Sequence, residues 1–229
     1  MAERNAFGQP VGPVVQDWTG CDPLPALTVS GQYTQISPFS VAADADALWE
    51  AVCEDDGRMW TYMPITPFEN RAAFDVWTHE IEASADPMFH TLRGEDGRVG
   101  GVASFLRIVP GHGVAEVGYI SFTPRLQRTR AATEAMFLMM QHVFAHGYRR
   151  YEWKCNAANA ASMRAAERLG FTYEGTFRQM QVVKGRNRDT AWFSILDSEW
   201  PAQRERFIAW LSPKNFDEEG RQRQSLQRG

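Results

Sequence analysis

Two short, glycine-marked turns between three strand-like segments are the feature that most restricts how this chain can fold. Residues 88–93, 98–107 and 114–122 each read as a strand, and they are separated by turns at residues 94–97 and 110–113. Turns of this length join neighbouring antiparallel strands, because the chain must reverse its direction within a few residues. The sequence therefore predicts an antiparallel meander.

Helices and further strands alternate on both sides of the meander. Helices are expected at residues 41–52, 67–81, 127–146, 159–169 and 201–211. Further strands are expected at residues 27–36, 148–155, 171–183 and 189–199, of which the last two form a hairpin. This order of elements predicts an α/β or α+β domain with a mixed sheet and with helices on both faces.

Composition divides the 229 residues into three parts. Residues 1–26 contain seven glycines and prolines, which exclude a long helix or a central strand and predict an extended arm. Residues 27–211 hold the expected domain. Residues 212–229 are polar and rich in Gln and Arg, so a frayed C-terminal tail is expected.

Charge and cysteine content limit the function. The formal net charge of -4 gives no general attraction to nucleic acid or to an anionic membrane, so neither is expected as a partner. Cys21, Cys53 and Cys155 are too few and too far apart for a disulfide framework or a zinc site, so no metal is expected. The sequence has no targeting signal and no apolar stretch of the roughly 18 to 20 residues that span a bilayer. A cytoplasmic location is expected.

The first chemical motif is a strand that leads into the start of a helix. The segment Glu116-Val-Gly-Tyr-Ile-Ser-Phe-Thr-Pro-Arg-Leu is followed by Gln127-Arg-Thr-Arg-Ala-Ala-Thr-Glu-Ala135. The first N–H groups of a helix are free, and the helix dipole adds positive charge there, so this point can bind an anion.

The second motif lies at the start of the short helix. It reads Asn159-Ala-Ala-Ser162, followed by Ala166-Glu-Arg-Leu-Gly-Phe171. Asparagine is a favoured N-cap, so Asn159 would begin this helix whatever else it contacts. A third and weaker motif is Glu174-Gly-Thr-Phe-Arg178 with the hairpin after it. For the basic turn of that hairpin, which contains Lys184, Arg186 and Arg188, a solvated tip is favoured over a binding patch.

The order of elements and the three motifs together resemble the GNAT superfamily, and within it the RimJ/RimL-like branch that acetylates protein N-termini or small amines. The resemblance covers residues 27–211 and implies a mostly antiparallel central sheet. It implies a transferase that moves an acetyl or similar acyl group from coenzyme A to a primary amine by direct attack. Acyl-CoA and an amine acceptor are then the partners, and a homodimer is left open.

In the family, the strand end binds the pantetheine arm, and the following loop and helix start hold the pyrophosphate. The resemblance places cofactor contacts at Tyr119, Ile120, Ser121, Phe122, Gln127, Arg128, Thr129, Arg130, Ala131, Ala132 and Asn159. The family pattern Q/R-x-x-G-x-G/A matches at Gln127 and Ala132, but arginine stands at two small-residue positions, 128 and 130. We expect at least one of these arginines to hold a phosphate, because a guanidinium can bind it with two parallel hydrogen bonds.

Two residues are candidates for catalysis. Glu116 is the expected general base, directly or through water, and an ordinary strand-edge glutamate is the alternative. Ser162 is the expected proton donor to the leaving thiolate, and an ordinary serine of the first helical turn is the alternative. A backbone N–H of residues 118–120 would polarise the thioester carbonyl.

Other readings of the sequence are less favoured. Cys155 could form an acyl-enzyme, but a small buried residue is the favoured interpretation. His90 and His112 are interpreted as surface or turn residues. The rival function is a non-catalytic or regulatory module that binds CoA without turnover.

Overall fold

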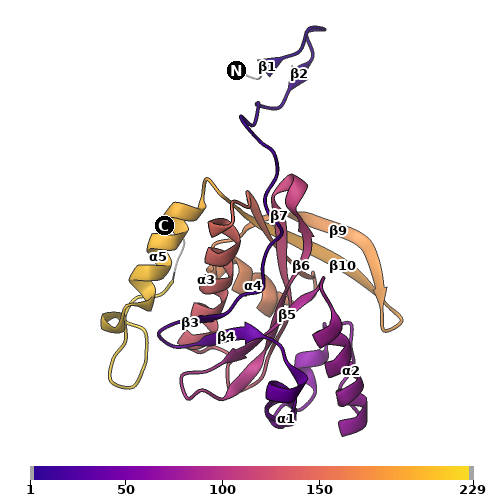
Figure 1. Cartoon of the computed structure of the whole chain (residues 1–229), viewed down its shortest axis with the longest axis vertical. Helices are drawn as coiled ribbons and strands as arrows, with labels where there is room; N and C mark the ends of the chain where they lie inside the picture. The colour runs from indigo at the N-terminus through magenta and orange to yellow at the C-terminus, as the bar shows by residue number, and fades with distance from the viewer. Residues whose placement is uncertain (1–2, 227–229) are drawn as a thin grey trace.

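The computed structural model describes residues 3–226 and is built on one eight-stranded sheet (Figure 1). The strands are β3 (Val29–Ser30), β4 (Gln35–Pro38), β5 (Met88–Arg93), β6 (Val99–Val109), β7 (Val114–Phe122), β8 (Arg150–Asn156), β9 (Thr172–Val183) and β10 (Arg186–Leu196). They lie in the order β3-β4-β5-β6-β7-β8-β10-β9. Neighbouring strands are antiparallel except β7 and β8, which are parallel. The expected mixed sheet is confirmed, and β5, β6 and β7 form the expected meander.

Helices cover both faces of this sheet (Figure 1). Helices α1 (Val41–Val52) and α2 (Arg71–Ala83) pack on one face, whereas α3 (Arg130–Ala145), α4 (Ala160–Arg168) and α5 (Trp200–Leu211) contribute to the core on the other. Val102 and Ala103 are consecutive on β6 and belong to the two opposite core clusters. Successive side chains of a strand point to opposite faces, so the central strands are buried on both sides.

A turn interrupts the single strand that was expected over residues 27–36. Instead, β3 and β4 form a short hairpin, and the backbone N–H groups of Gln32, Tyr33 and Thr34 donate to the carboxylate of Glu134 at 2.9, 2.6 and 2.9 Å. Glu134 is buried on α3. The expectation of one strand is wrong because the turn depends on a carboxylate that lies far along the chain.

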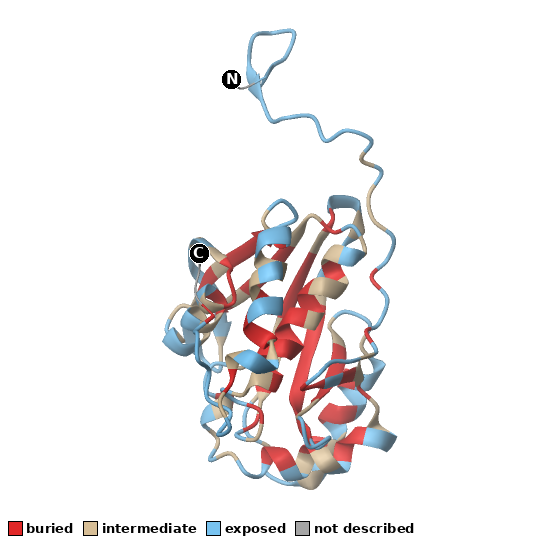
Figure 2. Cartoon of the chain, turned by 90° about the vertical axis from the view of Figure 1, so that its left-hand side faces the viewer, coloured by how far each residue is buried: buried red, intermediate tan, exposed pale blue. Residues whose placement is uncertain are grey.

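The N-terminal residues 3–17 extend away from the body of the fold (Figures 1 and 2). They include a hairpin of β1 (Glu3–Arg4) and β2 (Pro10–Val11), whose residues are all exposed. The chain makes its first contacts with the body at Trp18 and Cys21, which bond to the backbone of the turn before β7. An arm is therefore seen, but it is shorter than the expected one, because Leu24 is already buried in the core.

The C-terminal segment is packed rather than frayed. Phe216 and Leu226 are buried in the larger core cluster, and Trp210 Nε1 donates a 2.9 Å hydrogen bond to Gln222. The expectation of a frayed tail is wrong for residues 212–226, because two apolar side chains suffice to anchor a polar segment against α5. Residues 227–229 of the expected tail lie outside the described residues.

His90 also differs from the sequence-based expectation. It is completely buried on β5, and its Nε2 accepts a 2.9 Å hydrogen bond from the backbone N–H of Leu27. Burial lowers the pKa of His90 to about 4, so the ring is neutral at physiological pH. The interpretation of His90 as a surface or turn residue is wrong.

Candidate active site

The site opens where the two parallel strands separate. β7 and β8 are paired only from Val114 to Val117 and from Arg150 to Trp153. Beyond this point β7 stays with β6 and β8 stays with β10. A register shift in the β6–β7 ladder places Tyr119 in the left-handed region, with φ of 48°. Such a bulge leaves backbone groups out of the ladder and bends the strand, which makes room for a ligand between β7 and β8.

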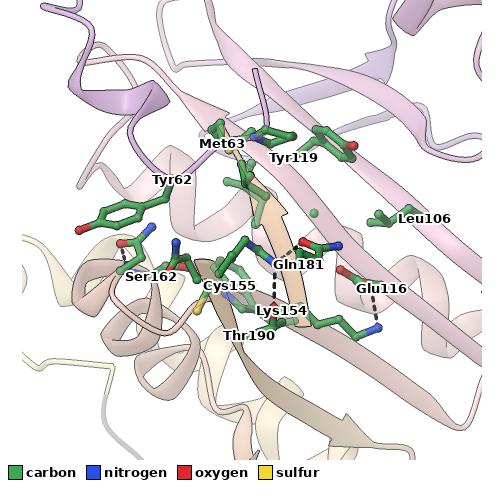
Figure 3. A pocket seen from close by; sticks show the side chains of 18 of the residues that line it. Tyr62, Met63, Leu106, Glu116, Tyr119, Lys154, Cys155, Ser162, Gln181 and Thr190 are labelled. Atoms are coloured by element: carbon green, nitrogen blue, oxygen red, sulfur yellow. Dashed lines mark hydrogen bonds and ion pairs between the residues drawn. The ribbon is translucent and has the colours of Figure 1, made fainter. Parts of the chain in front are cut away.

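A cavity of about 280 Å³ occupies this gap. Its wall combines β7 and β8 with the start of α4, the β9–β10 hairpin and the segment that precedes α2. The lining residues are Met59, Tyr62, Met63, Pro64, Leu106, Arg107, Glu116, Val117, Gly118, Tyr119, Ile120, Trp153, Lys154, Cys155, Asn156, Asn159, Ser162, Met180, Gln181, Val183, Arg188, Thr190 and Trp192. In the view of Figure 3, Tyr62 and Ser162 lie at one end of the cavity, and Glu116 lies at the other.

Glu116 is a buried carboxylate in the wall of this cavity. Its side chain is 7% exposed, and its Oε2 accepts a 2.7 Å hydrogen bond from Lys154 Nζ. Arg107 Nε lies 3.9 Å from the same oxygen. Burial raises the pKa of Glu116, although the charges of Lys154 and Arg107 act in the opposite direction. A carboxylate with a raised pKa is a better proton acceptor than an exposed one, as general bases require.

Lys154 links Glu116 to a longer charge network. Its Nζ also contacts Glu152 Oε2 at 2.6 Å and lies 3.7 Å from the centre of the Trp192 ring. Glu152 is in turn bound by Arg150 Nε at 2.7 Å. Sequence reasoning missed Lys154. The only signal was a lysine amid apolar residues on an otherwise buried strand, which does not identify its partner.

Asn159 and Ser162 lie at the start of α4, on the wall opposite β7. The Asn159 side chain accepts a 3.1 Å hydrogen bond from the Ser162 N–H and therefore caps the helix. Ser162 Oγ accepts a 3.1 Å bond from Trp153 Nε1 and also interacts with the thiol of Cys155. The hydroxyl therefore lies against Trp153 and Cys155 of β8. Both residues keep their ordinary structural roles and line the site as well.

Cys155 is buried in the core and also lines the cavity. Burial raises the pKa of its thiol, and the hydrogen bond with Ser162 opposes this only in part. The thiolate is the nucleophilic form of cysteine. The structure therefore supports the interpretation of Cys155 as a small buried residue.

The expected phosphate loop lies at the start of α3, outside the cavity lining. Thr129 caps the helix, with its Oγ1 accepting from the N–H of Ala132 at 3.1 Å. The Arg130 side chain is already paired: its Nε and Nη2 each donate a 2.6 Å hydrogen bond to the Glu95 carboxylate, and its guanidinium is 4.4 Å from the Tyr33 ring centre. Arg128 is exposed and has φ of 62°.

The structure thus brings together one part of the expected site. Glu116, Tyr119, Ile120, Asn159 and Ser162 line the same cavity. The other expected cofactor residues do not line it: Ser121, Phe122, Gln127, Arg128, Thr129, Arg130, Ala131 and Ala132. Sequence reasoning missed the segment before α2, because it carries no motif. It noted the β9–β10 hairpin but favoured a solvated tip for its basic turn, whereas Arg188 of that turn lines the cavity.

Within residues 3–226, no cluster of three or more potential ligands could hold a metal ion. No helix in the same range has the length and apolar character to cross a membrane.

Solved structures with the same arrangement of elements are acetyltransferases. A GCN5-related N-acetyltransferase from Brucella melitensis is 46% identical over 93% of this chain and 97% of its own, with a TM-score of 0.91. A probable acetyltransferase of the GNAT family from Chromobacterium violaceum is 38% identical over 84% of this chain and 98% of its own, with a TM-score of 0.78. No curated protein sequence matches the chain.

The fold and these neighbours define the class of an acyltransferase that acts on amines. The family model of the GNAT acetyltransferase domain matches residues 35–172. The chain therefore belongs to the GNAT acetyltransferase family and is an acyl-CoA-dependent N-acetyltransferase.

Proposed function

We propose that the chain transfers an acetyl group from acetyl-CoA to a primary amine, with Glu116 as the general base and Ser162 as the proton donor. One observation carries the assignment of the base: Glu116 is a buried carboxylate with a raised pKa in the wall of the cavity between β7 and β8. Ser162 lines the other end of the same cavity (Figure 3).

In the proposed reaction, a neutral amine attacks the thioester carbonyl carbon. The C–N bond forms while the carbonyl π electrons move to oxygen, and Glu116 takes a proton from the nitrogen. The C–S bond then breaks as the carbonyl re-forms, and Ser162 Oγ gives its proton to the leaving sulfur. Proton return from Glu116 to Ser162 through solvent restores both residues, so the enzyme ends unchanged.

The cofactor would lie along β7 and reach the start of α3. The bulge at Tyr119 supports a pantetheine contact with residues 119–122, since a bulged strand offers unpaired backbone groups. The first N–H groups of α3, at Arg130 and Ala131, support the pyrophosphate site. MccE, a microcin C7 self-immunity acetyltransferase with the same fold and 19% identity, has been solved with acetyl-CoA and AMP.

Of the two loop arginines, Arg128 is the better candidate for a phosphate contact. Arg130 already donates two hydrogen bonds to Glu95, so a phosphate would have to displace a carboxylate. The side chain of Arg128 is exposed and makes no hydrogen bond or ion pair with any residue from 3 to 226. It is therefore free to turn toward the 3′-phosphate or the pyrophosphate.

A finer placement in the family is also part of the proposal. RimJ of Mycobacterium smegmatis shares the fold at 20% identity and a TM-score of 0.67. We place the chain in the RimJ/RimL-like branch on the motifs of residues 116–171 and expect it to act in the cytoplasm. A homodimer remains a prediction, to be checked by light scattering of the purified protein.

Thiol release from acetyl-CoA in the presence of amines tests the proposed function. A panel of small amines and N-terminal peptides should contain acceptors that release free CoA, with the acetylated amine as the second product. Acetyl-CoA should also raise the melting temperature, because a ligand that prefers the folded state stabilises it by mass action. A thermal shift without thiol release for any amine would favour the rival, a non-catalytic CoA-binding module.

A further inference from the structure

The cavity wall carries more positive charge than its one carboxylate requires. Three cationic side chains, Arg107, Lys154 and Arg188, line it together with Glu116. Lys154 is shared between Glu116 and Glu152, so its charge is already balanced. Arg107 lies 3.9 Å from Glu116 as well, so the charge without a carboxylate partner is that of Arg188, in a protein whose formal net charge is -4.

Arg188 is held in place by neutral groups. Its Nη1 donates to Gln181 Oε1 at 2.8 Å and to Thr190 Oγ1 at 2.9 Å. Gln181 and Thr190 lie between the two ends of the cavity in Figure 3. Because both protons of Nη1 are used, these bonds fix the plane of the guanidinium and leave its Nε–Nη2 edge to face elsewhere.

No carboxylate accepts from that Nε–Nη2 edge. Among residues 3–226, the Arg188 side chain forms no ion pair and no hydrogen bond beyond the two from Nη1. Arg125, Arg130 and Arg150 are also partly buried and paired with a glutamate, whereas Arg168 donates to Thr133 and, within residues 3–226, has no carboxylate partner. Arg188 differs from Arg168 in lining the cavity. Desolvation lowers the pKa of Arg188, and the charge of Glu116 opposes this only in part.

The free edge of a guanidinium matches the two oxygens of a carboxylate. Arginine binds planar oxyanions with two parallel hydrogen bonds, and this geometry is stronger and more specific than a single contact. A half-buried guanidinium without a counter-ion is costly in the empty site. A bound anion would supply the missing partner.

The cavity is also small and partly covered. Its volume of about 280 Å³ lies at the lower end of ligand pockets, which run from about 300 to 1,000 Å³. Lys184 Nζ at the tip of the β9–β10 hairpin donates a 2.6 Å bond to the carbonyl of Trp60, so the hairpin is tied to the opposite wall. This space suits a compact acceptor better than a folded protein terminus.

We propose that the acceptor is a small amine that carries a carboxylate, and that the Nε–Nη2 edge of Arg188 binds this carboxylate while the amine lies near Glu116. The proposal rests on the proposed acetyl transfer and names the substrate class of the same site. Arg188 is then a specificity-determining residue. Its role is to orient the acceptor, and it takes no part in proton transfer.

The test uses matched pairs of amines in which a neutral amide replaces the carboxylate: leucine with leucinamide, and methionine with methioninamide. Steady-state thiol release gives kcat and KM for each amine at saturating acetyl-CoA. Titration calorimetry with the CoA-loaded protein measures binding of the same amines without turnover. The variants are Arg188→Gln, Arg188→Lys and the control Arg186→Gln, which removes the same charge from the exposed part of the same hairpin.

For Arg188→Gln we expect kcat/KM for the amino acids to fall about 10- to 100-fold, the range for loss of a charge-assisted hydrogen bond. The loss should appear in the KM for the amino acids. The kcat/KM for the amides and the KM for acetyl-CoA should change little. Comparing variant with wild type on one ligand cancels the difference in basicity between an amino acid and its amide. Arg188→Lys should recover only part of the loss, and Arg186→Gln should behave as wild type.

Several results would overturn the proposal. Equal loss on acids and amides would show that Arg188 only holds the hairpin, and a raised KM for acetyl-CoA would show that it binds the cofactor. Wild-type protein that binds the acids no more tightly than the amides, once each affinity is corrected for the fraction of neutral amine, would refute a carboxylate subsite. Tighter binding of aminomethylphosphonate than of either acid would refute it as well. If no amine is acetylated, the proposed function fails, and calorimetry still decides whether Arg188 selects the carboxylate.

Discussion

Replacing Glu116 by glutamine is the most direct test of the proposed base. The substitution keeps the shape of the side chain but removes its capacity to accept a proton. It also removes one of the two carboxylates around the buried Lys154 ammonium. Because Glu152 remains 2.6 Å from Lys154 Nζ, the ammonium keeps a partner. We therefore expect a stability loss of about 1 to 3 kcal/mol, the cost of one hydrogen bond to a charged group, and a folded protein.

The expected kinetic effect is a loss of turnover of about 10² to 10⁴ fold at neutral pH, the range for general acid–base catalysis. The pH dependence has a definite sign. The base must be ionised, and burial raises its pKa, so wild-type kcat/KM should fall as the pH falls through that raised pKa. The variant should lack this limb, and its deficit should shrink at high pH, where the amine loses its proton unaided.

Glu152→Gln is the matched control for this experiment. It also removes one carboxylate from Lys154, but Glu152 does not line the cavity. If proton transfer is the role of Glu116, Glu152→Gln should lose far less turnover than Glu116→Gln, and its pH profile should shift to lower pH because Lys154 then acts on Glu116 alone. The reasoning is refuted if Glu116→Gln turns over like wild type at neutral pH, or if both variants lose activity equally, which would assign the effect to the charge of Lys154.

Three further predictions concern the cofactor and the fold. Ser162→Ala should slow turnover by about 10² fold with little change in acetyl-CoA affinity; equal loss in both, measured by kinetics and calorimetry, would make Ser162 a positioning residue. Arg128→Ala should lower the affinity for CoA about 10- to 100-fold. If Arg128 binds the 3′-phosphate, the variant should also lose the preference for CoA over 3′-dephospho-CoA. Tighter CoA binding by Arg128→Ala or Arg130→Ala would show that the arginines obstruct the loop. Glu134→Gln should lower the free energy of unfolding in urea by about 2 to 4 kcal/mol, because one amide oxygen cannot replace a carboxylate that accepts three N–H groups. A loss no larger than that of Glu82→Gln, which removes only the charge of the acceptor of one exposed bond at a helix start, would contradict this.

The elements that could be predicted from the sequence are those with local causes. β5 and β7 have the expected bounds, and α1 does as well, because strand-forming runs, tight turns and helical spacing are all properties of neighbouring residues. The β3–β4 hairpin and the packed C-terminal segment were missed for the opposite reason. The hairpin depends on the carboxylate of Glu134, and the C-terminal segment depends on the burial of Phe216 and Leu226 in the larger core. In both cases the contacting residues are far apart in the sequence.

The candidate site shows the same division. Glu116, Asn159 and Ser162 stand in motifs, so the sequence alone could propose them, and the structure places all three around one cavity. The partner of Arg130 could not be foreseen, because Glu95 lies in the β5–β6 turn and nothing near it marks it as a partner. Of the two arginines expected to bind phosphate, Arg128 is therefore the one that we propose.

The environment of Glu116 could not be predicted, because its electrostatics come from side chains on several different strands. Glu116 lies on β7, Lys154 on β8 and Trp192 on β10, and the pairing of these strands alone brings the carboxylate, the ammonium and the indole ring together. Whether Glu116 accepts a proton near neutral pH depends on two opposing effects: burial raises its pKa, and Lys154 lowers it. Because Lys154 is paired with Glu152 as well, it lowers the pKa of Glu116 less than a lysine paired with Glu116 alone would. A second carboxylate outside the cavity is therefore part of what keeps the proposed base available for proton transfer.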